Sequence, residues 1–201
     1  MARPVVILFA KSPRLGLVKR RLASEIGDVA ALRFYRNQLF RMIRELAKLK
    51  NFEVILALTP RHSRLQTRPG FRNITQNNSG LGQRMARCFD MFRRRQVILI
   101  GADIPDLSAA IIRSAVQKLK SHDAAFGPAA DGGYYLVAMG AKRPTAPFAN
   151  VRWSSPHALS DTLMNFQHHR ITMLEKLHDV DTGHDFKTAS ISSLRRVPKY
   201  P

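Results

Sequence analysis

The stretch QVILIGADIPDL, residues 96–107, is an apolar run that stops at an aspartate. Continuous apolar runs of this kind are typical of strands in the middle of a sheet that is covered on both faces. Asp103 follows the run, and Pro105 prevents the chain from continuing as a regular strand. Ligands of open α/β sheets bind beyond the carboxyl ends of the strands, so Asp103 is a candidate functional residue.

Three other segments share this apolar character, and helical patterns lie between them. The other predicted strands are PVVILFA at 4–10, EVILALT at 53–59 and GYYLVAMG at 133–140. Apolar residues recur at helical spacing over 32–49, 85–92 and 111–119. The alternation predicts an α/β fold: a single-domain, Rossmann-like, mostly parallel sheet with helices on both faces and one antiparallel strand near 133–140.

Length and composition indicate one domain over residues 1–201. The chain is 45% hydrophobic, which is enough to bury a substantial core. Cys88 is the single cysteine, which excludes an intrachain disulfide, and the apolar segment near the start is too short for a signal peptide. No run approaches the roughly 20 apolar residues of a membrane span. We therefore expect a cytoplasmic protein.

The charge balance is strongly basic. Lysine and arginine total 33 against 14 acidic residues, a formal net charge of +19 at pH 7. Phosphates, nucleic acid and an anionic membrane contacted peripherally are the partners that such a charge attracts. Charge alone does not choose among them.

The segment AKSPRLGLVKRRLA, residues 10–23, directly follows the first predicted strand. Gly16 permits an unusual turn or a close backbone approach. Five cations surround it and could bind a polyanion: Lys11, Arg14, Lys19, Arg20 and Arg21. The segment contains neither GxxxxGK[ST] nor GxGxxG, and a solvated basic loop is the alternative interpretation.

Asp103 and Asp106 have different expected roles. A carboxylate at the position of Asp103 could hold Mg²⁺ or Mn²⁺, which would bridge phosphate oxygens and neutralise a departing diphosphate. Asp106 precedes the helix predicted from Ser108. Acidic residues are stabilising at helix N-termini, so we favour a structural capping role for Asp106.

Asp131 stands before Gly132 and Gly133 in the segment FGPAADGGYYLVAMG. It could bind a metal, accept a hydrogen bond from a substrate hydroxyl or act as a base. From the local sequence alone, an Asp-Gly turn that joins two strands is the favoured interpretation.

The segment DVDTGHDF, residues 179–186, contains a third candidate carboxylate. Thr182 and Asp185 have the spacing of a capping box at a helix start. Asp181, with His184 nearby, could complete a metal shell made mostly of oxygen. The histidines have no HExxH or C2H2 spacing, which argues against a zinc site.

Taken in order, six segments resemble a group of small bacterial proteins classed provisionally as glycosyltransferases. The segments are KSPRLGLVKRRLA, GLGQRM (80–85), IGADIPDL, GPAADGGYYLVAMG, RWSSPHAL (152–159) and DVDTGHDF. The resemblance implies the glycosyltransferase-A, or nucleotide-diphospho-sugar transferase, fold. That superfamily also includes nucleotidyltransferases that make molybdopterin-guanine dinucleotide, cytidylylated sugars and guanylylated phospholactate.

The resemblance also implies roles for individual residues. It implies that Gly16, Lys19 and Arg21 contact nucleotide phosphates and that Gly82 lies near the base or ribose; Ala10 and Lys11 are further candidate nucleotide-binding residues. The implied metal ligands are Asp103 and Asp181, and Asp131 would face the acceptor as the catalytic residue. Arg20 stands where relatives usually have threonine, and Gln83 where an acid is common. Both differences make the site more basic.

The leading hypothesis is a divalent-metal-dependent glycosyltransferase that uses a nucleotide-diphospho-sugar and an unknown acceptor. One alternative is a nucleotidyltransferase, in which a phosphorylated small molecule attacks a nucleoside triphosphate and pyrophosphate leaves. A second alternative is a noncatalytic protein that binds polyanions. The sequence lacks an RNP-like or helix-turn-helix signature, so we expect no specific nucleic-acid partner.

Overall fold

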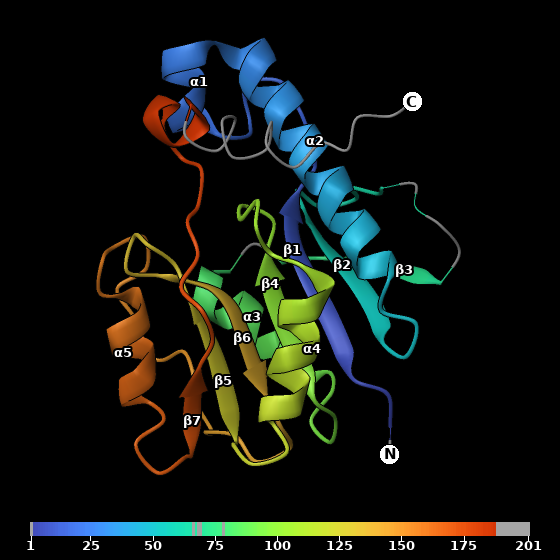
Figure 1. Cartoon of the computed structure of the whole chain (residues 1–201), viewed down its shortest axis with the longest axis vertical. Helices are drawn as coiled ribbons and strands as arrows, with labels where there is room; N and C mark the ends of the chain where they lie inside the picture. The colour runs from blue at the N-terminus through green and yellow to red at the C-terminus, as the bar shows by residue number, and fades with distance from the viewer. Residues whose placement is uncertain (1, 66, 68–69, 78, 188–201) are drawn as a thin grey trace.

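A computed structural model of the chain describes residues 2–65, 67, 70–77 and 79–187 (Figure 1). The strands are β1 (Val5–Lys11), β2 (Glu53–Thr59), β3 (Phe71–Thr75), β4 (Val97–Gly101), β5 (Ala124–Pro128), β6 (Tyr134–Met139) and β7 (Ile171–Met173). The helices are α1 (Arg20–Ile26), α2 (Asp28–Ala47), α3 (Leu81–Asp90), α4 (Ala109–Lys118) and α5 (Ala158–Met164). A further helical turn begins at Gly183.

The strands form one sheet of seven in the order β3-β2-β1-β4-β6-β5-β7. Strand β6 is antiparallel to both of its neighbours, and the other pairs are parallel. The mostly parallel sheet with one antiparallel strand near 133–140 is therefore confirmed. All four predicted strands and all three predicted helices are present.

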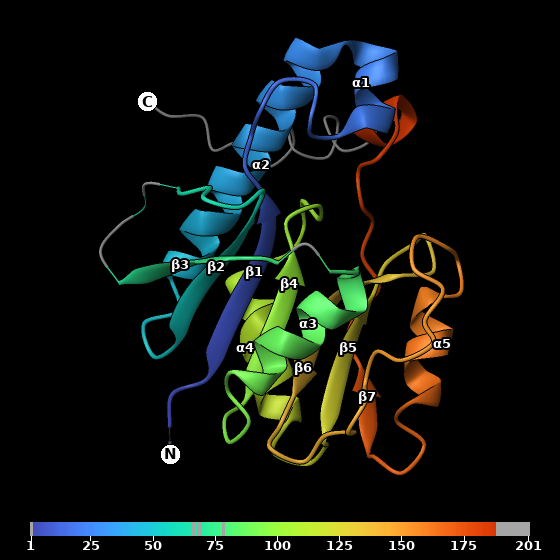
Figure 2. The same ribbon diagram turned by 180° about the vertical axis from the view of Figure 1, so that it is seen from behind.

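Helices cover both faces of the sheet, which explains why its central strands are apolar throughout. Alternate residues of β1 enter different clusters: Val6 and Leu8 pack with α2 and α4, whereas Val5 and Ile7 pack with α3. Figure 1 shows α2 and α4 in front of the sheet, and Figure 2 shows α3 on the opposite face.

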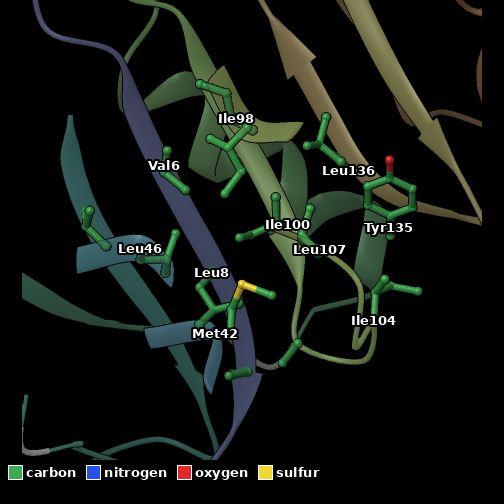
Figure 3. Packing of buried hydrophobic residues seen from close by; sticks show 14 of the residues in the cluster. Val6, Leu8, Met42, Leu46, Ile98, Ile100, Ile104, Leu107, Tyr135 and Leu136 are labelled. Atoms are coloured by element: carbon green, nitrogen blue, oxygen red, sulfur yellow. The ribbon is translucent and has the colours of Figure 1, made fainter. Parts of the chain in front are cut away.

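The larger cluster extends to the end of the sheet that carries the predicted site. Met42 and Leu46 of α2 lie against Val6 and Leu8 (Figure 3). Ile104, Leu107 and Tyr135 belong to the same cluster, and Leu107 is fully buried. The chain that follows β4 is thus packed into the core.

The register of β1 and β4 brings two candidate segments together. The strands are parallel, and Phe9 pairs with Gly101. Lys11 and Asp103, each two residues further on, therefore leave the sheet at the same edge. Within the described residues, no helix is both long enough and apolar enough to cross a membrane.

A buried carboxylate joins the starts of β5 and β7, away from the carboxyl edge of β1 and β4. The Arg170 backbone N–H donates to Asp123 Oδ2 at 2.9 Å, and the Asp123 N–H donates to the Arg170 carbonyl at 2.7 Å. The Asp123 side chain is 8% exposed. The Arg170 N–H, together with the charges of Lys142 and Arg170, lowers the pKa of Asp123 below its ordinary value of 3.8.

We expect Asp123→Asn to lower the free energy of unfolding at neutral pH by about 1 kcal/mol, because a neutral amide is a weaker acceptor than a carboxylate. A lowered pKa contributes stability that is present above the unfolded-state pKa and is lost as pH falls through the folded-state value. The difference from the original protein should therefore shrink on acidification from about pH 7 to pH 3 in urea denaturation. A difference that grows on acidification would contradict this assignment. Asp90→Asn, on the exposed end of α3, is the control.

Candidate functional site

A cavity of about 620 Å³ lies at the carboxyl edge of β1, β2 and β4, where β6 begins. This is the location at which open α/β sheets bind ligands. Its basic lining residues are Lys11, Lys19, Arg20, Arg21 and Arg84. Its acidic lining residues are Asp103, Asp131, Asp179 and Asp181. In a chain with only 14 acidic residues, four around one cavity mark it as more than an extension of the basic surface.

Lys19 occupies the centre of this charged lining. Its Nζ lies 2.7 Å from Asp103 Oδ1 and 2.8 Å from Asp181 Oδ1. The Lys19 side chain is only 5% exposed, whereas the Asp103 and Asp181 side chains are 55% and 41% exposed. The ammonium is therefore enclosed, while both carboxylates remain accessible to a ligand.

The environment of Lys19 keeps it charged. Burial by itself would lower the pKa of Lys19, but the charges of Asp103 and Asp181 and their hydrogen bonds outweigh burial, and the pKa is raised above 10.5. The Lys19 backbone is left-handed, with φ 48° and ψ 47°, at the residue that precedes α1. Non-glycine residues adopt this conformation only when surrounding contacts hold it, and the two ion pairs supply such contacts.

Packing fixes the two carboxylates that hold Lys19. Ala102 and Ile104, on either side of Asp103, are both buried. Val180 is buried beside Asp181, and the helical turn that follows is closed by a reciprocal capping pair. The Thr182 N–H donates to Asp185 Oδ2 at 2.9 Å, and the Asp185 N–H donates to Thr182 Oγ1 at 3.2 Å. The predicted capping box is therefore confirmed.

The two carboxylates suit a hard cation that arrives with phosphate. Their Oδ1 atoms converge on one point, which the Lys19 ammonium now holds. The part of the chain that the structure describes has no group of three histidine, cysteine or acidic residues arranged to hold a metal ion. Mg²⁺ is commonly bound by one or two carboxylates together with substrate phosphates and waters, and Asp103 and Asp181 fit that donor set.

The other sequence-predicted residues fall into two groups. Ala10, Lys11 and Arg21 line the cavity, but Gly16 and Gly82 are not among its lining residues. Gly16 lies in a turn, with φ 71°. A Cβ on buried Gly82 would lie 3.0 Å from the Phe148 carbonyl oxygen and 3.0 Å from the Trp153 ring. Gly82 therefore permits close packing beneath the cavity wall.

Asp131 lies in the turn between β5 and β6 and also faces the cavity. Its Oδ1 accepts a hydrogen bond from the Gly133 N–H at 2.8 Å, as the turn interpretation predicts. Asp179 lies close enough to Asp131 for the two charges to interact. Burial is the larger cause and the charge of Asp131 the second, and both raise the pKa of Asp179. Asp179 was not among the predicted site residues, although it precedes Asp181 by two positions in an extended segment.

The wall beside the Asp131 turn is the segment 152–157, which sequence reasoning did not assign to the site. Arg152 is held by Asp161 through two hydrogen bonds of 2.8 Å. Trp153, Ser154 and Ser155 line the cavity, and Ser154 has φ 58°. Trp153 packs edge-on to Tyr134, with ring centroids 6.3 Å apart, and is the single tryptophan of the chain.

Two further cavity residues missed from the sequence are polar side chains with structural partners. Gln76 Nε2 donates to the Ala57 carbonyl at 2.7 Å, and its Oε1 accepts a hydrogen bond from Arg84 Nη1 at 2.7 Å. The Tyr35 hydroxyl donates to the Lys11 carbonyl at 2.9 Å. No sequence motif identifies Gln76 or Tyr35, because the role of each side chain depends on a hydrogen-bond partner that is distant in the sequence.

Gly132 locks the Asp131 turn against the 152–157 wall. Its φ is 86°, its carbonyl accepts a hydrogen bond from the Leu159 N–H at 3.0 Å, and a Cβ would lie 2.2 Å from the Pro156 carbonyl oxygen. Gly16 also has positive φ, but a Cβ there would meet nothing within 4 Å. An alanine at either position would strain the backbone, but only an alanine at Gly132 would also clash with a neighbouring segment. Comparing the two substitutions therefore distinguishes the cost of backbone strain from the cost of close packing.

We expect Gly132→Ala to lower the free energy of unfolding by about 2 kcal/mol more than Gly16→Ala, because both variants strain the backbone but only Gly132→Ala forces two segments apart. Urea denaturation measures both changes. Equal losses would show that the two segments are not tightly packed. The fluorescence of Trp153 should shift in Gly132→Ala alone.

Comparison with solved structures identifies the fold. The chain aligns over 100% of its length with 93% of a protein from Desulfovibrio desulfuricans G20 assigned provisionally as a nucleotide-diphospho-sugar transferase, at 29% identity and a TM-score of 0.81. It also aligns with 2-C-methyl-D-erythritol 4-phosphate cytidylyltransferase from Thermus thermophilus, at 13% identity and a TM-score of 0.55, over 98% of this chain and 100% of that one.

A third structure is Rv0371C from Mycobacterium tuberculosis H37Rv in complex with manganese. It is 16% identical, with a TM-score of 0.54, over 97% of this chain and 100% of that one. At 13% and 16% identity, the cytidylyltransferase and Rv0371C show a shared fold only. The nucleotide-diphospho-sugar transferase-like fold that the sequence resemblance implies is therefore confirmed.

No curated protein matches the chain. Residues 42–155, however, match the family described as "Uncharacterized protein conserved in bacteria (DUF2064)". This match covers more than half of the sequence and includes β4, Asp103, the Asp131 turn and Trp153. The chain belongs to the DUF2064 family.

Proposed function

We propose that this protein is a metal-dependent transferase that binds the phosphates of a nucleotide at Lys19, Asp103 and Asp181. The leading reaction is transfer of a glycosyl group from a nucleotide-diphospho-sugar to an acceptor. The observation that carries the proposal is the enclosed Lys19 ammonium, paired with two accessible carboxylates inside a cavity of about 620 Å³. The likeness to the Desulfovibrio protein supports the same class of donor.

The cavity contains charges of both signs, which a nucleotide diphosphate with a divalent cation would match. Lys11, Lys19 and Arg21 would bind phosphate oxygens, and Arg20 lies in the same lining. Asp103 and Asp181 would hold Mg²⁺ or Mn²⁺. Such an ion neutralises charge that develops on the departing diphosphate.

Asp131 is the proposed base for the acceptor. In the proposed reaction, Asp131 takes the proton of an acceptor hydroxyl, whose oxygen forms the new bond to the sugar carbon. The bond from that carbon to the phosphate oxygen breaks, and the nucleoside diphosphate leaves with the bonding electrons. The turn fixed by Gly132 and Gly133 holds Asp131 at the cavity wall, beside the segment that carries Trp153.

Nucleotidyl transfer is the second candidate, because the cytidylyltransferase from Thermus thermophilus shares the fold. The same cations would then bind a triphosphate, and pyrophosphate would leave. Product analysis separates the reactions, since glycosyl transfer releases a nucleoside diphosphate and nucleotidyl transfer releases pyrophosphate. A noncatalytic polyanion-binding role is disfavoured, because a basic surface alone does not account for four aspartates around one cavity.

We expect Lys19→Met to weaken the binding of a nucleoside diphosphate by at least about tenfold, because a charged phosphate contact is lost in an enclosed site. Titration calorimetry with the five common nucleoside diphosphates, each in the presence of Mn²⁺, measures the effect. Lys48→Met is the control, because Lys48 is 60% exposed and does not line the cavity. An equal loss in both variants would show that diffuse charge attracts the nucleotide.

Asp103→Asn should remove most of the Mn²⁺-dependent part of nucleotide affinity while leaving the fold intact, because an amide is a poorer ligand than a carboxylate for hard cations. Asp181→Asn should have the same effect, and the double variant should lose little more if both residues hold one ion. Asp90→Asn is the exposed control. If Mn²⁺ still raises the nucleotide affinity of Asp103→Asn as much as that of the original protein, Asp103 is not a metal ligand.

A further inference from the structure

Two leucines project from the loop between β1 and α1. Leu15 and Leu17 are 57% and 56% exposed. The loop is a tight turn, in which the Leu17 N–H donates to the Arg14 carbonyl at 3.2 Å and Gly16 has φ 71°. A positive φ at the third residue is the requirement of a type II turn, so Gly16 has a structural reason to be glycine.

The chain that follows the turn is anchored. Val18 is 2% exposed and belongs to the core cluster beneath the cavity. Lys19 comes next, and its side chain is enclosed by the ion pairs with Asp103 and Asp181. Val18 and Lys19 thus fix the end of the turn that carries the two exposed leucines.

Exposed arginines flank the two leucines along the chain. Arg14, Arg20 and Arg21 are exposed, and Arg20 and Arg21 also line the cavity. Asp103 and Asp181 approach this segment in space, but both are paired with Lys19. Along the chain, the nearest acidic residues are Glu25 and Asp28. Val29 is also exposed, but it follows Asp28 directly, so we leave it out of this surface.

Exposed leucines beside arginines match the chemistry of an anionic lipid surface. Leucine side chains enter the boundary between headgroups and acyl chains, and arginines contact lipid phosphates. Exposed leucines and arginines in one loop supply the two kinds of contact that such binding uses, apolar burial and electrostatic attraction. The net charge of +19 favours the same extended anionic partner.

We propose that the loop from Arg14 to Arg21 docks this protein on an anionic bilayer, with Leu15 and Leu17 entering the interface. The same segment lines the cavity through Val18, Lys19, Arg20 and Arg21, so docking would bring the cavity mouth close to the lipid surface. If the protein is the proposed transferase, this position of the cavity means that its acceptor is a molecule carried in the membrane. This conclusion about the acceptor rests on the proposed function, whereas docking itself does not.

Co-sedimentation with lipid vesicles tests the docking surface without any nucleotide. The vesicles contain phosphatidylcholine alone or equal parts of phosphatidylcholine and phosphatidylglycerol. At an ionic strength of about 0.15 M, the protein should bind the mixed vesicles only, and Leu15→Ser/Leu17→Ser should bind them at least about tenfold more weakly. Met164→Ser is the matched control, because Met164 is 65% exposed on α5, far from α1 in Figure 1.

Two results would overturn the proposal: no binding of the original protein to mixed vesicles, or equal binding by the double leucine variant, which would show attraction through diffuse charge. Thermal denaturation checks that the double variant is folded, and the single variants Leu15→Asn and Leu17→Asn provide the test if it is not. Nucleotide titration without vesicles is a separate measurement. If the original protein binds nucleotide but does not bind the mixed vesicles, docking alone is refuted and the proposed function is not.

Discussion

The ammonium of Lys19, held between the carboxylates of Asp103 and Asp181, links three parts of the chain that are far apart in sequence. It ties the start of α1 to the end of β4 and to the segment before the last helical turn. Removing one partner from an enclosed ion pair leaves uncompensated charge, so each of the three residues constrains the other two. Lys19 has a left-handed backbone, follows the exposed leucine turn by two residues and lines the cavity, so this contact lies where the three features meet.

The central part of the fold follows from local sequence, because β1, β2, β4 and β6 are buried on both faces and are apolar almost throughout. The amphipathic pattern likewise identifies α2, α3 and α4. The strand β5 and the edge strands β3 and β7 were not among the predicted strands. FRNIT and ITM are short and only partly buried, so neighbouring strands, not hydrophobic pattern, define them. The same holds for the short helices α1 and α5.

The site could be predicted where a residue follows a strand directly. Lys11 and Asp103 were identified in this way, whereas Asp131 was identified from the turn before the strand at 133–140 and from the family resemblance; each lines the cavity. The pairing of Lys19 with Asp103 and Asp181 could not be predicted, because sequence assigned the lysine to phosphate and the acids to metal as separate groups. The wall that carries Trp153 was missed as a site for a similar reason. Its position depends on Gly132, which lies on another segment and contacts Pro156 closely.

The proposed function requires Lys19 to exchange its carboxylate partners for phosphate when nucleotide and metal bind. A crystal structure with Mn²⁺ and a bound nucleoside diphosphate, with manganese located by anomalous scattering, measures this directly. We expect a manganese peak within bonding distance of Asp103 and Asp181, with Lys19 Nζ on a phosphate oxygen. A structure in which Lys19 stays between the two carboxylates and the nucleotide binds elsewhere would refute the proposed site.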